Sequence, residues 1–157
     1  MNAVEPVIER PSALLSLTEA HRAVIEITSL NLSRRRLQKI APLGDGHAVM
    51  VLPGFMGNDG YNAAMRRFLA GINYSVHGWG QGRNLGPRGG VLEGLQERIH
   101  ELFERHSGPV SLVGHSLGGI FARELGREFP DNVAQGISPG SPCGRGRSGG
   151  SVPPPAL

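Results

Sequence analysis

Two patterns of apolar residues alternate along the middle of this chain. Short continuous apolar runs, rich in β-branched residues, are typical of strands buried on both faces of a parallel sheet. Longer segments have an apolar residue every three or four positions, which is typical of helices with one buried face. Together these patterns predict strands over residues 48–52, 74–77, 110–113 and 132–137, and helices over residues 60–70, 91–106 and 117–129. Strands that alternate with helices predict an α/β fold, an open parallel sheet with helices on both of its faces.

The two ends of the chain differ from this central region, so we divide the sequence into residues 1–43, 44–137 and 138–157. In the first segment, residues 12–32 have the spacing of an amphipathic helix, followed by a linker. Such a helix either packs on its own domain, which we favour, or makes a peripheral contact with a membrane. The last segment is almost entirely Gly, Pro, Ser and Arg, and we expect it to be disordered. We also expect a frameshift or truncation near Pro142, which would end the fold after about its fourth strand.

Composition narrows the location and the partners. The chain has 157 residues and a formal net charge of only +3, and its arginines are scattered, so we expect no nucleic-acid partner. We find no signal-peptide pattern and no apolar stretch long enough for a transmembrane segment, which predicts a cytoplasmic protein. Its single cysteine, Cys143, cannot form an internal disulfide.

The most informative stretch is the predicted strand 110–113 and the residues after it, Gly114-His115-Ser116-Leu117-Gly118. Gly-x-Ser-x-Gly between a strand and a helix is the pattern of a nucleophile elbow, which exposes the serine at the apex of a sharp turn. We expect Gly114 and Gly118 to be glycines because side chains there would collide with the strand or the helix. The backbone N–H of Leu117 and the positive end of the following helix then lie beside the reacting carbonyl group.

This motif and three further segments resemble the α/β-hydrolases, in particular their lipase and esterase branch. These segments are Leu52-Pro53-Gly54-Phe55, Gly78 to Pro87, and Gly140-Ser141-Pro142, so the resemblance covers about the first half of that fold. It implies the strand order second, first, third, fourth. It also implies a serine hydrolase acting on a small-molecule or lipid ester, with no cofactor and no metal.

The same resemblance assigns site residues. Ser116 is the implied nucleophile, and the implied oxyanion donors are the backbone N–H groups of Leu117 and of Phe55 or Met56. Trp79 is the implied apolar wall of the substrate site. The alternative for the loop that contains Trp79, a dinucleotide-binding loop, fails because its glycines do not have the required Gly-x-Gly-x-x-Gly spacing.

A serine nucleophile needs a histidine base and an acid that orients it, and in α/β-hydrolases both follow the serine. No histidine follows Ser116 in this sequence. Among the earlier histidines, only His77 is expected at the same edge of the sheet. The acid and the histidine of the triad are therefore missing, and we expect the chain alone to be nearly inert. The alternative is a catalytically inactive hydrolase fragment or a partner-dependent binding module.

Overall fold

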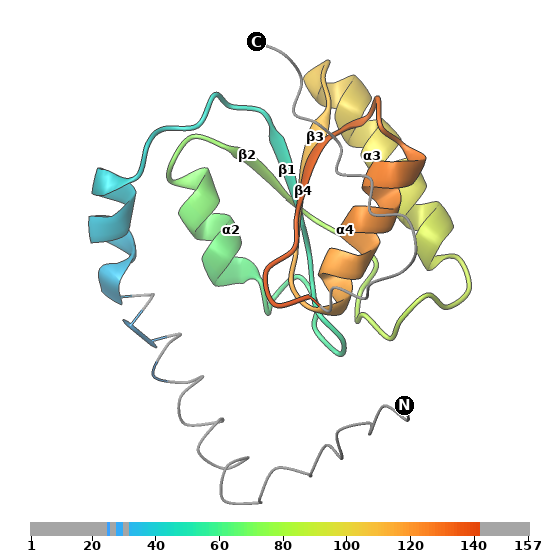
Figure 1. Ribbon diagram of the computed structural model, residues 1–157. Helices are drawn as coiled ribbons and strands as arrows, with labels where there is room; N and C mark the ends of the chain where they lie inside the picture. Colours follow the sequence, from blue (N-terminus) through green and yellow to red (C-terminus); the bar gives the residue numbers. More distant parts are fainter. Residues whose placement is uncertain (1–24, 26–27, 30–31, 142–157) are drawn as a thin grey trace, which may run out of the picture. The chain divides into compact units, whose positions relative to one another are not determined.

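The computed structural model of this protein describes residues 25, 28–29 and 32–141 (Figure 1). The chain divides into two compact units, Met1–Pro42 and Leu43–Leu157. In the first unit, residues 32–40 are helical, although the sequence had suggested a linker there. This segment contains good helix formers such as Leu, Arg, Gln and Lys, and Pro42 is incompatible with further helix. The helix expected over residues 12–32, with its membrane contact, falls mostly outside the described residues and stays a prediction.

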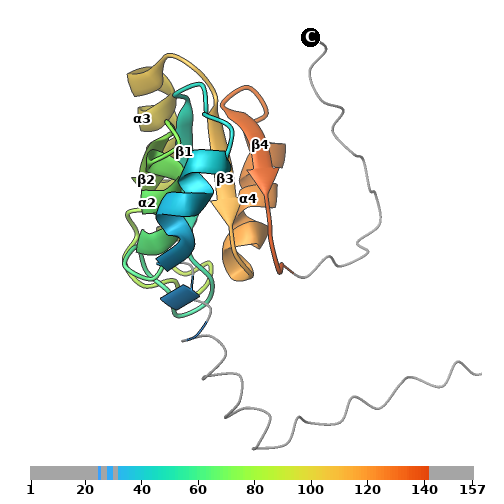
Figure 2. The same cartoon turned by 90° about the vertical axis from the view of Figure 1, so that its left-hand side faces the viewer.

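The second unit contains a four-stranded sheet in which every strand is parallel to its neighbours. Its elements are β1 (Ala48–Leu52), α2 (Ala63–Ala70), β2 (Ser75–Gly78), α3 (Val91–His106), β3 (Val110–Gly114), α4 (Leu117–Glu128) and β4 (Val133–Ile137). The strand order is β2-β1-β3-β4, as the sequence predicted. Helix α2 lies on one face of the sheet, and α3 and α4 lie on the other (Figures 1 and 2). The α/β class is therefore confirmed.

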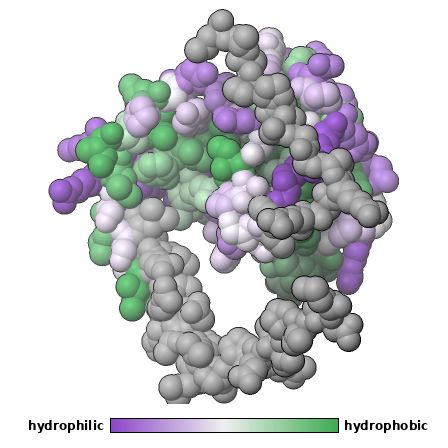
Figure 3. Space-filling view, viewed as in Figure 1, coloured by the Kyte–Doolittle hydropathy of each residue, from purple (hydrophilic) through white to green (hydrophobic). Residues whose placement is uncertain are grey.

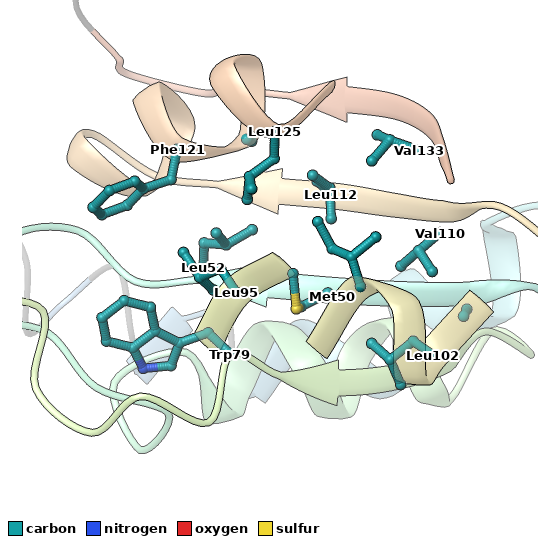
Figure 4. Close-up of a cluster of buried hydrophobic side chains, with 13 residues drawn as sticks. Met50, Leu52, Trp79, Leu95, Leu102, Val110, Leu112, Phe121, Leu125 and Val133 are labelled. Carbon is teal, nitrogen blue, oxygen red and sulfur yellow. The ribbon is translucent and has the colours of Figure 1, made fainter. Parts of the chain in front are cut away.

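The core lies between the sheet and the pair α3 and α4 (Figure 4). All five residues of β1 are buried, because β1 is an inner strand and its two neighbours shield its edges. Side chains from β1 and β3 meet one face of each helix. The main contributors are Met50, Leu52, Val110, Leu112, Leu95, Ile99, Leu102, Phe121 and Leu125. This packing fixes the carboxyl ends of β1 and β3 side by side, with Leu52 in register with Gly114.

Strand β4 is at the edge of this sheet, and only its first residue, Val133, is buried. Ile137, at the other end of β4, is 47% exposed. Apolar side chains also reach the surface in the region between α2 and α4 (Figure 3). An edge strand of this kind presents unpaired N–H and C=O groups to solvent. None of the helices described is long and apolar enough to cross a membrane.

Candidate active site

Ser116 occupies the apex of the turn between β3 and α4. Its backbone has φ of 53° and ψ of −117°, a combination that residues other than glycine rarely adopt. Such a conformation costs about 1–3 kcal/mol and persists only where the surrounding structure enforces it. A strained serine between a buried strand and a helix N-terminus is the local geometry of a nucleophile elbow.

Three glycines make this turn sterically feasible. A Cβ atom on Gly114 would overlap the carbonyl oxygen of Gly118 in α4, and one on Gly118 would overlap the carbonyl oxygen of Leu52 in β1. A Cβ atom on Gly119 would overlap the Ser141 hydroxyl and lie 2.6 Å from the Gly114 carbonyl oxygen. Most of these obstacles are backbone atoms, which cannot move without disturbing the sheet. The close approach of α4 to β1 and β3 therefore requires glycine at each position.

The segment after β4 holds the turn from the other side. The Ser116 N–H donates to the carbonyl oxygen of Pro139 (3.4 Å), and the Ser141 hydroxyl donates to the carbonyl oxygen of Ser116 (2.8 Å). Residues 138–141 thus have a defined place, whereas the sequence had suggested that disorder begins at residue 138. The composition of the tail concealed this role, because serine and glycine are common both in disordered segments and in tight turns.

The loop after β1 lies against the elbow. A Cβ atom on Gly54 would lie only 3.5 Å from the Cβ atom of Ser116, so the backbone of this loop passes close to Ser116. The Met56 N–H donates to the carbonyl oxygen of Asn84 (2.7 Å). Because that N–H already has an acceptor, Met56 is not a free oxyanion donor, and the choice between Phe55 and Met56 falls on Phe55. The N–H groups of Phe55 and Leu117 form no hydrogen bond with the described residues.

Asn84 holds the loop after β1 in place, a role that the sequence did not reveal. Its side chain is fully buried and donates to the carbonyl oxygen of Pro53 (2.7 Å), while its backbone N–H donates to the carbonyl oxygen of Gly57 (2.8 Å). The Asn84 side-chain oxygen accepts the N–H of Gly86 (3.1 Å). One asparagine therefore connects both ends of the loop that carries Phe55.

Asp59 makes a second connection that the sequence did not reveal. Its carboxylate accepts the backbone N–H groups of Trp79 (3.0 Å) and Gly80 (3.2 Å) at the end of β2. A side chain on Gly78 would occupy the space of this carboxylate. The loops after β1 and β2 are thus joined at the carboxyl edge of the sheet.

Trp79 belongs to the core, which corrects its expected role as a wall of the substrate site. It is fully buried and packs with Leu52, Leu95 and Phe121 (Figure 4). Its indole N–H donates to the carbonyl oxygen of Gly82 (3.0 Å). A residue without exposed surface cannot contact a substrate. The sequence showed a tryptophan in a glycine-rich loop but not the direction of its side chain.

A pocket of about 290 Å³ opens beside Ser116. It is lined by Gly54, Phe55, Met56, Gly57, Tyr61, His115 and Ser116. The side chains of Phe55, Met56 and Tyr61 are 62%, 51% and 66% exposed. The pocket therefore combines the hydroxyl group of Ser116 with an open and mainly apolar rim, the role that the sequence had suggested for Trp79.

None of the described residues acts as a hydrogen-bonded base for Ser116. The Ser116 hydroxyl forms no hydrogen bond with any described residue, although the exposed His115 lines the same pocket. The Nε2 atom of His77 lies 2.9 Å from Nε2 of His106, so the one histidine expected at the correct edge pairs with the end of α3 instead. Burial, and then the charges of His106, Arg98 and Arg105, lower the pKa of His77.

Two of the three acids that follow Ser116 have other partners. Glu124 pairs with Arg127 (2.9 Å), and Glu128 accepts a hydrogen bond from Gln96 (3.0 Å). The described residues thus contain a strained serine, candidate oxyanion donors and an apolar pocket, without the relay that activates the serine in a complete triad.

Comparison with models of known protein families finds none that matches this chain, and no curated protein matches it.

Proposed function

We propose that this chain carries the nucleophile and the oxyanion-binding part of a serine ester hydrolase of the α/β-hydrolase type, in the lipase and esterase branch. The observation that carries the proposal is the backbone of Ser116, with φ of 53° and ψ of −117° at the junction of β3 and α4. Folded proteins retain strain of this kind mainly at functional sites. The glycines around Ser116 leave room for that conformation. Hydrogen bonds with residues 139 and 141 hold it in place.

The chemistry follows from the position of the groups. The Ser116 hydroxyl attacks the carbonyl carbon of an ester, and its oxygen forms the new bond while the proton passes to a base. Negative charge then develops on the former carbonyl oxygen, and the N–H groups of Phe55 and Leu117 are the donors assigned to it. Leu117 begins α4, so the helix N-terminus adds a positive potential at the same place. The alcohol leaves, and an acyl-enzyme remains on Ser116.

The rim of the pocket indicates the substrate class. Phe55, Met56 and Tyr61 offer apolar surface to the acyl or alcohol part of a small-molecule or lipid ester. A pocket of about 290 Å³ suits a short acyl chain or a small aromatic alcohol.

The missing base limits the rate. In a comparable serine hydrolase, loss of the catalytic histidine lowers kcat by about 10⁶, and oxyanion donors and binding retain about 10³–10⁴ over the reaction in water. The second candidate is therefore a binding module that retains the hydrolase site without its turnover. The observation that favours it is the lack of any hydrogen bond between the Ser116 hydroxyl and the described histidines.

Covalent labelling separates the two. A fluorophosphonate probe forms a bond to an activated serine oxygen and releases fluoride. We expect slow labelling at Ser116, identified by mass spectrometry, that Ser116→Ala abolishes. Binding of short-chain esters without any labelling of Ser116 would favour the binding module.

A further inference from the structure

A second serine in this molecule has the relay that Ser116 lacks. Ser111 lies in β3, and its Oγ is 2.8 Å from Nε2 of His47, just before β1. The other ring nitrogen of His47, Nδ1, bonds to the carboxylate of Asp45, which also accepts the backbone N–H of His47 (3.1 Å). Asp45, His47 and Ser111 therefore form a continuous chain of hydrogen bonds in the order of a catalytic triad. We call these residues the Ser111 relay.

The neighbours of the relay assign its protons. The ionised Asp45 carboxylate can only accept, so Nδ1 of the neutral His47 ring carries the proton that points at it. Nε2 is then the acceptor for the Ser111 hydroxyl proton, while the Ser111 oxygen accepts the side-chain N–H of Gln135 (3.3 Å). A neutral imidazole with this tautomer is a general base for the serine. The carboxylate is in place to stabilise the imidazolium that forms when the base takes the proton.

Several structural features converge on this arrangement. The pairing of β3 with β4 has an irregularity between Val110 and Ser111, so that Val110 faces Val133 while Ser111 faces Gln135. Bulges of this kind redirect side chains and are frequent beside active sites. The imidazole of His47 packs edge-on against Tyr74, with ring centroids 5.1 Å apart. Gly46, between Asp45 and His47, has φ of 89°, which glycine readily adopts.

The relay opens into its own pocket, away from the elbow. This pocket has a volume of about 320 Å³ and includes Asp45, His47 and Ser111 in its lining. The rest of the lining consists mainly of small side chains, with His106 and Gln135 as further polar groups. It shares no lining residue with the pocket beside Ser116. Ser111 itself is only 2% exposed, so only a small reagent can reach its oxygen.

We propose that Asp45, His47 and Ser111 form a second reactive-serine site, at which small activated esters acylate Ser111. In this step the Ser111 oxygen forms a bond to the acyl carbon, and its proton passes to His47 Nε2. The bond from the acyl carbon to the aryl oxygen breaks, and the phenolate leaves with the electron pair. The product is acyl-Ser111 with an imidazolium at His47, which releases its proton to solvent.

The backbone around Ser111 predicts modification without turnover. Strand β3 is paired with β1 on one side and with β4 on the other, so its backbone N–H groups are engaged in the hydrogen bonds of the sheet. Nothing there corresponds to the open N–H of a helix N-terminus beside Ser116. Without such donors the tetrahedral intermediate is poorly stabilised, and removing one donor alone costs about 10²–10³ in rate. This loss slows acylation and deacylation alike, but an aryloxide is a much better leaving group than the Ser111 alkoxide. Acylation by an activated ester is therefore faster than hydrolysis of acyl-Ser111, and the acyl group accumulates up to one equivalent per chain.

The test uses the full chain with Ser116→Ala and Cys143→Ser, treated with p-nitrophenyl acetate, because the single thiol of the chain would also release p-nitrophenolate. We expect a burst of p-nitrophenolate that approaches one equivalent, with the acetyl group on Ser111. The tryptic peptide between Arg105 and Arg123 also contains Ser107, so the acetylated serine must be located by tandem mass spectrometry. His47→Gln should slow acetylation by about 100-fold, the range of a general base, and Asp45→Asn should slow it less. His100→Gln, on the exposed side of α3, is the control and should leave the rate unchanged.

The acetylated residue is identified in a chain that keeps Ser111, so the test does not require the Ser111→Ala variant to fold. A folded Ser116→Ala chain that becomes acetylated on its single lysine, Lys39, but not on Ser111 would overturn the proposal, and so would an acetylation rate that His47→Gln leaves unchanged. The result does not depend on the proposed function, because labelling of Ser116 is read in the unsubstituted chain at a different residue.

Discussion

The side-chain N–H of Asn84 donates a hydrogen bond of 2.7 Å to the carbonyl oxygen of Pro53, which lies 31 residues earlier in the chain. This bond is fully buried, and it fixes the loop that presents the N–H of Phe55 to the Ser116 pocket. The loop after β2 therefore determines the geometry of the loop after β1.

Asn84→Asp should destabilise the fold and misplace that loop. The variant replaces the donor with an oxygen and leaves the Pro53 carbonyl unsatisfied, which costs about 1–3 kcal/mol. Urea unfolding measures the loss, and fluorophosphonate labelling of Ser116 measures the effect on the site. Asn132→Asp is the control, because its side chain has no hydrogen bond among the described residues, and it should change stability by less than about 0.5 kcal/mol. Equal effects of the two variants would contradict the role of Asn84.

The sequence predicted the regular elements and the elbow because their signals are local. The apolar run of Ala48–Leu52 and the glycines around Ser116 each fall within a few residues, and the structure has them where expected. The contacts that complete the site join distant positions. Asn84 reaches back to Pro53, and His47 reaches Ser111 over 64 residues. No spacing rule relates such pairs, since only the folded sheet brings them together.

The error on Trp79 has a similar origin. A tryptophan in a glycine-rich loop at the carboxyl edge of a sheet has the right position for a substrate wall. Its side chain instead turns into the core and meets Leu95 and Phe121. Side-chain direction in an irregular loop depends on the backbone dihedrals, which the sequence pattern does not specify.

Substitution by alanine should lower the stability of the fold at one glycine of α4 and raise it at another. Gly118→Ala places a Cβ atom against the carbonyl oxygens of Leu52 and Pro53, so we expect a loss of about 3 kcal/mol or more and no labelling of Ser116. Gly126→Ala places its Cβ atom 3.7 Å from Val133, an ordinary contact, and should gain about 0.5–1 kcal/mol from helix propensity. Thermal unfolding of both variants tests this. A mild effect of Gly118→Ala would mean that α4 does not approach β1 as described.

His77 should make the stability depend on pH near neutrality. Because burial and nearby positive charge hold its pKa below the ordinary value of 6.5, protons bind more readily to the unfolded chain. As far as His77 determines it, the free energy of unfolding is therefore highest above about pH 6.5, and it decreases as the pH falls below that value. Urea midpoints between about pH 5.5 and 8 should show this decline, and His77→Gln should flatten it.

His100→Gln is the matched control for that measurement, and it should keep the pH dependence of the unsubstituted chain. Asp45 does not interfere, because its backbone and side-chain hydrogen bonds with His47 hold its pKa below 3.8, outside the range measured. A stability that rises on acidification from neutral pH would contradict the assigned direction.

Replacing the nucleophile with one that needs no base tests the elbow itself. Ser116→Cys, in a Cys143→Ser background that leaves one thiol, should react with p-nitrophenyl acetate to give a thioester. A thiol ionises with an ordinary pKa of about 8.5, and the N-terminus of α4 should lower that value. The acylation rate at position 116 should therefore rise with pH and reach its plateau at a lower pH than for a free thiol, while Ser116 itself stays nearly inert for lack of a base. Stopped-flow release of p-nitrophenolate, after subtraction of the release by the Cys143→Ser chain that keeps Ser116, gives the rate at each pH.

Ser107→Cys in the same background provides a closely matched comparison. Ser107 also has positive φ, 52° against 53° for Ser116, but it caps the C-terminus of α3 rather than preceding the N-terminus of a helix. The negative end of the helix dipole should raise the pKa of a thiol there, and no oxyanion donors face it. We expect the Ser116→Cys chain to be acylated faster at neutral pH by about 10-fold or more, combining a larger thiolate fraction with the N–H groups of Phe55 and Leu117. Equal rates at the two positions would show that the strained turn at Ser116 gives no advantage to a nucleophile.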